Sequence, residues 1–139
     1  LSPNELYWRS EDSKLSYEEK KTFGRRLIWR DLAYFHLNSF PLMRDKSIRE
    51  HYEKTEWVSD VEERRRLEAW KKGMTGFPIV DAGMRELYAT GWMTQSVRMV
   101  VASFLTEYLR INWTKGAEWF PYTLVVADSA SDPMTWKEE

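Results

Sequence analysis

The stretch WKKGMTGFPIVDAGMRELYATGWMTQSVRMVVASFLTEYLRINW, residues 70–113, decides the fold of this chain. Near its start, the glycines of Gly73-Met74-Thr75-Gly76 free the backbone and Pro78 fixes it, which is typical of a turn. Because proline is tolerated in the first turn of a helix, a helix is expected to begin there. Its apolar residues recur at the spacing of one helix face: Val80, Met84, Leu87 and Tyr88.

A second helix is expected after the break at Thr90-Gly91. Its apolar stripe is predicted to lie in the core and consists of Val97, Val100, Val101, Phe104, Leu105, Tyr108 and Leu109. A helix that is apolar nearly all round is usually buried, yet Arg98 lies within it. Desolvating a guanidinium is costly unless an anion or several acceptors meet it. Arg98 therefore either pairs with a carboxylate in the core or faces a bound, electron-rich ligand.

The remainder of the chain also predicts helices. Ser16 and Glu19 form a capping box before a helix that Pro41 should end near Phe40. Residues 61–72 predict a charged helix with a mostly solvated face, whose apolar contacts are Leu67 and Trp70. Residues 1–13 are weakly patterned, and Leu1-Ser2-Pro3 is expected to be a loop. Lys115-Gly116 is expected to be a turn before Trp119-Phe120 re-enter the core. With no alternating strand pattern, the fold class is predicted to be all-α.

Composition narrows the function classes. The 139 residues suffice for one domain with a core, and a net charge of −1 gives no bulk attraction to nucleic acid. Without cysteine there are no disulfides or thiolate metal sites. Two histidines, His36 and His51, make a histidine metal cluster improbable, so no metal is expected. No apolar run reaches the length of a membrane span, and no membrane partner is expected.

The motifs TGFPIVDAGMREL, GWM and RMVVASFL, followed by INW, occur in order along this chain. The segment from Phe23 to Trp136 resembles the FAD-binding domain of the cryptochrome/DNA photolyase family. The resemblance implies a helical FAD-binding domain over residues 1–139, incomplete at both ends and without the family's antenna-type α/β domain. The segments GWMTQSVRM and GRRLIWRDLAYF look most like the plant and algal photolyase-like or plant-like cryptochrome branch.

The resemblance assigns five residues to the cofactor FAD. Arg98 matches the arginine beside the isoalloxazine ring, and Asp132 the residue facing flavin N5. A carboxylic acid there can deliver a proton to a reduced flavin if burial raises its pKa, although a solvated loop residue or helix cap would be the ordinary reading of Asp132. The other three are Ser2 at the diphosphate loop, Arg30 near the cofactor and Asp128 of the Asp-x-Asp loop.

The same resemblance assigns an electron-hopping chain to tryptophans that could otherwise simply pack the core. Trp136 would be nearest the flavin, Trp113 intermediate and Trp57 at the surface. On the substrate side of the cofactor, the resemblance implies Trp29, Trp92 and Gln95.

This sequence also departs from the family pattern. Val126 replaces the first aspartate of the Asp-x-Asp pair, which in the family usually pairs with the arginine at Arg98. The glutamate that holds a pyrimidine dimer in repair enzymes falls at Arg26, and a guanidinium cannot accept the hydrogen bonds that a carboxylate accepts. Thr94-Gln95-Ser96 replaces a His-Asn-Arg stretch, which argues against standard dimer repair.

Three functions follow as hypotheses. The first is a blue-light photoreceptor whose flavin redox state alters the binding of a signalling protein. The second is a light-dependent DNA lyase of the deoxyribodipyrimidine photo-lyase type, which would act on a dimer extruded from damaged DNA. The third is a truncated family fragment that no longer holds flavin. Whether the chain is an enzyme therefore stays open, and the resemblance is compatible with either nucleus or chloroplast.

Overall fold

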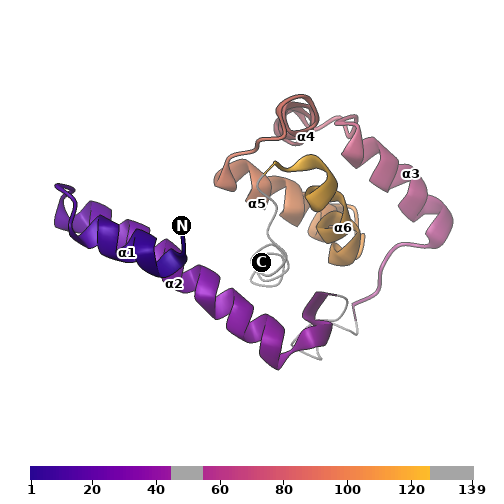
Figure 1. Ribbon diagram of the computed structural model, residues 1–139. Helices are drawn as coiled ribbons and strands as arrows, with labels where there is room; N and C mark the ends of the chain where they lie inside the picture. Colours follow the sequence, from indigo (N-terminus) through magenta and orange to yellow (C-terminus); the bar gives the residue numbers. More distant parts are fainter. Residues whose placement is uncertain (45–54, 126–139) are drawn as a thin grey trace.

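The computed structural model describes residues 1–44 and 55–125, and within these ranges every regular element is helical (Figure 1). The predicted all-α class is therefore confirmed. The elements are α1 (Pro3–Glu11), α2 (Tyr17–Ser39), the 3₁₀ helix η1 (Pro41–Arg44), α3 (Asp60–Lys71), α4 (Pro78–Thr90), α5 (Gln95–Ser103), the π-helical turn η3 (Phe104–Tyr108) and α6 (Trp113–Thr123).

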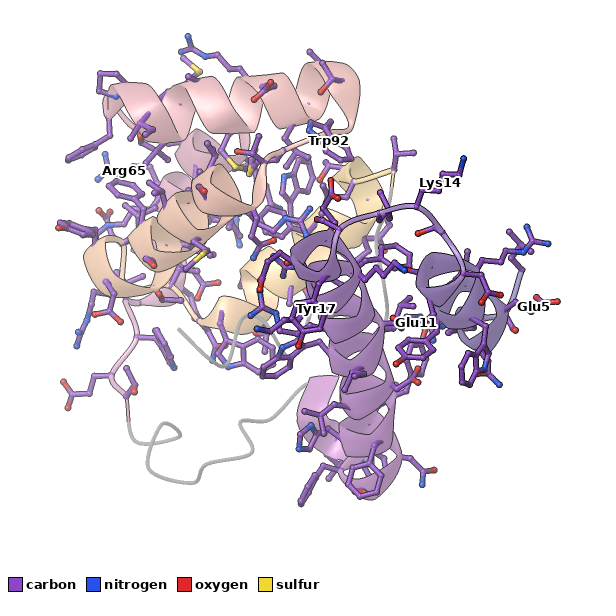
Figure 2. All side chains as sticks on the ribbon, turned by 90° about the vertical axis from the view of Figure 1, so that its left-hand side faces the viewer. Glu5, Glu11, Lys14, Tyr17, Arg65 and Trp92 are labelled. Atoms are coloured by element: carbon purple, nitrogen blue, oxygen red, sulfur yellow. The ribbon has the colours of Figure 1, made fainter. Side chains whose placement is uncertain are left out.

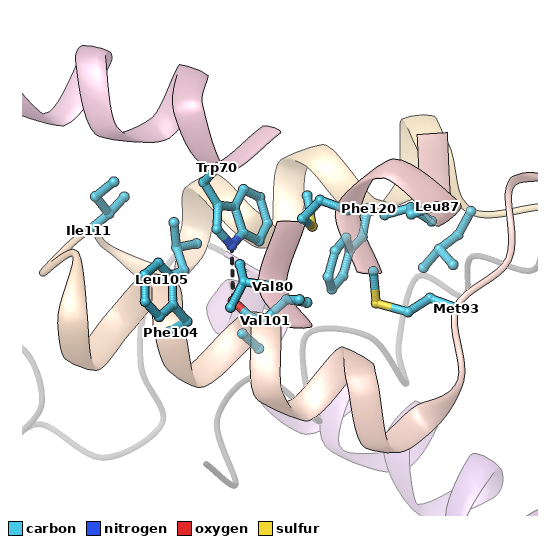
Figure 3. Packing of buried hydrophobic residues seen from close by; sticks show 12 residues of the cluster. Trp70, Val80, Leu87, Met93, Val101, Phe104, Leu105, Ile111 and Phe120 are labelled. Carbon is cyan, nitrogen blue, oxygen red and sulfur yellow. Dashed lines mark hydrogen bonds between the residues drawn. The ribbon is translucent and has the colours of Figure 1, made fainter. Parts of the chain in front are cut away.

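The hydrophobic core lies in the part of the chain from α3 to α6, while α1 packs on α2 to one side of it (Figure 1). Figure 3 shows this core from close by. Its buried members are Trp70, Val80, Met84, Leu87, Met93, Val101, Ala102, Phe104, Leu105, Ile111, Phe120 and Leu124. The stretch that the sequence singled out therefore supplies most of the core.

Trp70 joins three helices at the centre of this core. Its side chain is 0% exposed, and its ring centroid lies 6.0 Å from that of Phe120 on α6. Its indole Nε1–H donates a hydrogen bond of 3.0 Å to the carbonyl oxygen of Val101 on α5 (Figure 3). Because a buried indole N–H needs an acceptor, this bond fixes how α3 lies against α5.

The α4–α5 contact depends on Gly83. A Cβ placed on Gly83 would lie 2.5 Å from Cγ1 of Val97, which is closer than non-bonded carbons approach.

We expect Gly83→Ala to lower the free energy of unfolding by about 1 kcal/mol, because the overlap outweighs the gain in helix propensity. Urea unfolding would measure this free energy. The double variant Gly83→Ala/Val97→Ala should be less destabilised than the sum of the two single variants, because truncating Val97 removes the overlapping atom. A Gly83→Ala protein more stable than the parent would contradict this account.

Most predicted helix boundaries are confirmed. The Ser16 hydroxyl accepts from the backbone N–H of Glu19, and the Glu19 carboxylate accepts from the N–H of Ser16, so the capping box begins α2 as expected. The α2 helix ends at Ser39, before Pro41. The α4 helix begins at Pro78 and ends at Gly91, whose φ of 69° lies in the left-handed region that glycine adopts readily.

Two local predictions are wrong. Pro3 begins α1 instead of lying in a loop, because Ser2 and Glu5 make a second capping box and proline fits the first turn of a helix. Lys115 and Gly116 lie inside α6 instead of in a turn. Asn112 begins that helix by accepting from the N–H of Thr114 at 3.0 Å, a cap that the sequence reading had overlooked.

The core stripe of the second predicted helix is only partly confirmed. Val101, Phe104 and Leu105 are buried, but Val100 is exposed and Tyr108 is 71% exposed. The helix widens at η3, where the N–H of Leu109 donates to the carbonyl of Phe104, five residues earlier. A π turn inserts one residue, so the 3.6-residue spacing no longer predicts which side chains face the core beyond it.

Candidate functional site

Arg98 lies in the first half of α5, and its side chain is half-buried. The two residues that follow it, Met99 and Val100, are 47% and 39% exposed although both are apolar. The α5 helix thus carries a guanidinium beside exposed apolar side chains, while Val101 and Ala102 point into the core. This combination of hydrogen-bond donors and apolar wall fits the chemistry of a flavin, whose ring needs a few polar contacts in a dry setting.

Four residues of the predicted flavin site lie outside the described part of the chain: Val126, Asp128, Asp132 and Trp136. No group of three or more histidine, aspartate or glutamate side chains arranged as metal ligands occurs within residues 1–44 and 55–125. In the same ranges, no helix is both long and apolar enough to cross a bilayer.

The structure joins the segments that carry Trp57 and Trp113, two tryptophans of the predicted electron-hopping chain. The N–H of Val58, next to Trp57, donates to the carbonyl of Arg110 at 2.9 Å. Arg110 stands three residues before Trp113, the first residue of α6. Arg66 of α3 donates from Nη1 to the carbonyl of Leu109 at 3.1 Å and holds the same turn. The segment before α3 and the turn before α6 are thereby held side by side.

Trp57 and Trp113 differ from the surface tryptophans in their burial. Both are half-buried, and Trp113 packs against the hydrophobic core. Trp29 on α2 and Trp92 before α5 are exposed, as is Gln95 (Trp92 is labelled in Figure 2). The predicted substrate-side residues therefore present their side chains at the surface of the described protein.

The remaining predicted cofactor residues have local partners in this structure. Arg30 lies on the exposed surface of α2, with Nη1 3.4 Å from Oδ1 of Asp31 and its guanidinium 4.6 Å from the ring centroid of Tyr34. Arg30 and Asp31 therefore form an ion pair at the surface. The Ser2 hydroxyl caps α1.

Asp81 is a buried carboxylate that the sequence reading did not identify. It is 8% exposed and accepts hydrogen bonds from Thr75 N at 2.8 Å, Thr75 Oγ1 at 2.6 Å and Gly76 N at 2.9 Å. Burial alone would raise the pKa of Asp81, but these hydrogen bonds and the charge of Arg85 outweigh it and lower that pKa. The carboxylate thus holds the turn before α4, and the spacing of Thr75, Gly76 and Asp81 was the available signal.

We expect Asp81→Asn to lower the free energy of unfolding at neutral pH by about 1–3 kcal/mol, because an amide cannot replace a carboxylate that accepts three bonds. A lowered folded-state pKa adds stability above the unfolded pKa, and that stability is lost as the pH falls below about 4. Acid titration of stability by circular dichroism should therefore show a steeper loss for the parent than for the variant. Asp12→Asn, at an exposed helix end, is the matched control; equal acid slopes for parent and Asp81→Asn would refute this role.

Comparison with known proteins agrees with this combination of fold and site. A model of the FAD binding domain of DNA photolyase matches residues 23–138. The chain is 44% identical over 115 residues to a deoxyribodipyrimidine photo-lyase of Agrobacterium fabrum and 34% identical over 133 residues to cryptochrome-2 of Arabidopsis thaliana. These matches cover 83% and 96% of this chain, but it spans only 23% and 21% of the two relatives.

Solved structures show the same likeness. A bacterial class III photolyase from Agrobacterium tumefaciens superposes with a TM-score of 0.89 and 37% identity, over 99% of this chain and 28% of that one. A cryptochrome of Synechocystis gives a TM-score of 0.87 and 34% identity, over 99% of this chain and 29% of the other. The helical fold is thus that of a flavin-binding domain. The chain belongs to the photolyase/cryptochrome family and matches its FAD-binding domain, of which FAD is the cofactor.

Proposed function

We propose that this chain is the FAD-binding part of a blue-light flavoprotein in which Trp57, Trp113 and Trp136 carry electrons between the surface and the flavin pocket. The observation that carries the proposal is the hydrogen bond from Val58 N to Arg110 O, which ties the segments of Trp57 and Trp113 together at 2.9 Å. A route of this kind needs aromatic rings in short steps, and Trp57 and Trp113 are half-buried indoles on the two segments that this bond joins.

FAD, when bound, supplies the absorption of blue light and the capacity to take up or give electrons. Arg98 would donate hydrogen bonds to the bound flavin, and the apolar side chains of α5 would keep water from it. By family resemblance, Asp132 would supply a proton, and Asp128, Arg30 and Ser2 would add polar contacts to the cofactor. The residues of α5 support this assignment by their burial and chemistry, and the others by family resemblance alone.

We favour a photoreceptor of the plant-like cryptochrome type over a repair enzyme. Arg26 is an exposed cation on α2, where a dimer-binding enzyme of the family has a carboxylate. The neutral Gln95 and a net charge of −1 also give little attraction for the phosphates of DNA. The signalling partner would be a protein that responds to the redox state of the flavin. Residues 1–139 would then form part of the helical domain of a longer protein.

Dimer repair is the second candidate. Deoxyribodipyrimidine photo-lyases from several bacteria are among the relatives. The exposed indoles of Trp29 and Trp92 favour this candidate as well, because exposed aromatic rings can stack on an extruded base.

The cofactor is tested first, by titrating the purified protein with FAD and following flavin absorption and fluorescence. We expect saturable binding that Arg98→Met weakens at least tenfold, or about 1.4 kcal/mol, because methionine fills similar space without donors. Arg9→Met on the exposed surface of α1 is the matched control and should change affinity less than twofold. Absence of saturable binding by the parent would reject the proposal and favour a flavin-free fragment.

Once flavin binds, blue-light illumination with a pyrimidine-dimer oligonucleotide separates receptor from lyase. We expect light to change the flavin spectrum without restoring the dimer to intact bases. Light-dependent repair would overturn the photoreceptor assignment in favour of the lyase. In that case Arg26→Glu should raise the rate further, because it restores a hydrogen-bond acceptor.

A further inference from the structure

A pocket of about 500 Å³ lies among α3, α4 and α6, and none of its lining residues is among those assigned to the flavin. Its walls are formed by Glu68, Lys71, Lys72, Arg85, Tyr88 and Trp119. We refer to it as the α3–α4–α6 pocket. Its volume lies in the range of small-molecule sites, which is about 300–1,000 Å³, and is too small for a folded partner or a duplex.

The charge of this pocket favours an anion. Three cationic side chains line it against one carboxylate, although the whole chain carries a net charge of −1. Lys72 Nζ lies 3.5 Å from Glu68 Oε2, in an exposed pair that competes only weakly for a bound anion. A local excess of positive charge on a nearly neutral chain is the expected pattern for a phosphate or carboxylate ligand.

Its aromatic residues favour a flat ring in the same ligand. The Tyr88 side chain is 76% exposed although it continues the apolar stripe of α4. Trp119 packs against the core and has the Lys71 ammonium 4.8 Å from its ring centroid. Exposed aromatic faces next to cations provide both stacking and charge for a base with attached phosphates.

We propose that the α3–α4–α6 pocket binds a nucleoside polyphosphate, with the base against Tyr88 and Trp119 and the phosphates on Lys71, Lys72 and Arg85. A local pocket of about 500 Å³ favours a free nucleotide over a nucleic-acid strand, since a strand follows an extended basic groove. The site uses none of the residues assigned to the flavin, and it would give the protein a second small-molecule ligand.

Isothermal titration of the flavin-saturated protein with ATP tests the site, and adenosine and inorganic tripolyphosphate are titrated separately. We expect ATP to bind at least tenfold more tightly than either part, because base and phosphates each contribute. Lys72→Glu and Tyr88→Ala should each weaken ATP binding at least tenfold and leave FAD affinity unchanged.

The controls carry the same substitutions at or just before the start of α2, outside the pocket. Lys14→Glu removes an exposed lysine, and Tyr17→Ala removes a tyrosine that is 74% exposed and also has a lysine near its ring (both residues are labelled in Figure 2). Both should bind ATP within twofold of the parent. Tripolyphosphate binding as tight as ATP, ATP affinity unchanged in Lys72→Glu, or tighter binding of a short oligothymidine than of ATP would each overturn the proposal.

Discussion

Trp70→Ala is expected to lower the free energy of unfolding by about 3–5 kcal/mol, the range for a fully buried aromatic cut back to alanine. The change removes the contact with Phe120, empties the space between three helices and deletes the donor to the carbonyl of Val101. Because a small domain has a total stability of only about 5–15 kcal/mol, this loss would remove a large fraction of it.

Chemical denaturation followed by circular dichroism measures the effect. Trp70→Phe separates its causes, because phenylalanine keeps most of the ring contacts and loses the N–H donor. We expect it to cost about 1–3 kcal/mol. Trp8→Ala, on α1 and 60% exposed, is the matched control and should cost less than about 0.5 kcal/mol. Equal destabilisation by Trp70→Ala and Trp8→Ala would show that the core is not centred on Trp70.

Trp113→Phe should slow photoreduction in the flavin-loaded protein by an order of magnitude or more. Phenylalanine preserves an aromatic ring of similar position but is much harder to oxidise than indole, so the middle step of the route is blocked. The rate is measured as loss of oxidised-flavin absorbance under blue light with an external reductant. Flavin affinity serves as the check that the pocket is intact.

Trp119→Phe provides the matched control, because Trp119 lies on the same helix and also packs against the core. Its photoreduction rate should stay within twofold of the parent. An unchanged rate in Trp113→Phe would remove this residue from the electron route, and a comparable loss in Trp119→Phe would mean that the route runs through a different part of α6.

The sequence predicts the fold well where local signals and burial agree. The α2 and α4 helices begin and end where the Ser16 cap, Pro78 and Gly91 predict, because each acts within a few residues. The first helix was missed although Ser2 and Glu5 carry the same capping box as Ser16 and Glu19. Its short length and weak apolar pattern concealed the signal.

Predictions fail where the result depends on distant parts of the chain. Tyr88 and Tyr108 fit an apolar helix face by spacing, yet both are exposed, since α4 borders the pocket and η3 changes the helical register. For the site, the family resemblance assigns Trp57 and Trp113 to one route, but only the folded chain shows the backbone bond from Val58 to Arg110 that joins their segments. The three donors to Asp81 likewise become apparent only when the turn is folded.

Because of the π turn at η3, the number of residues in this turn determines the direction of the Trp113 side chain. An α-helix rotates by about 100° per residue, so one deletion between Phe104 and Tyr108 would restore regular winding and rotate all that follows by roughly that angle. Ile111 would leave the interior and the indole after it would face another direction. Chimaeras that exchange this segment must therefore keep its number of residues as well as its side chains, because that number sets the direction in which the Trp113 indole points.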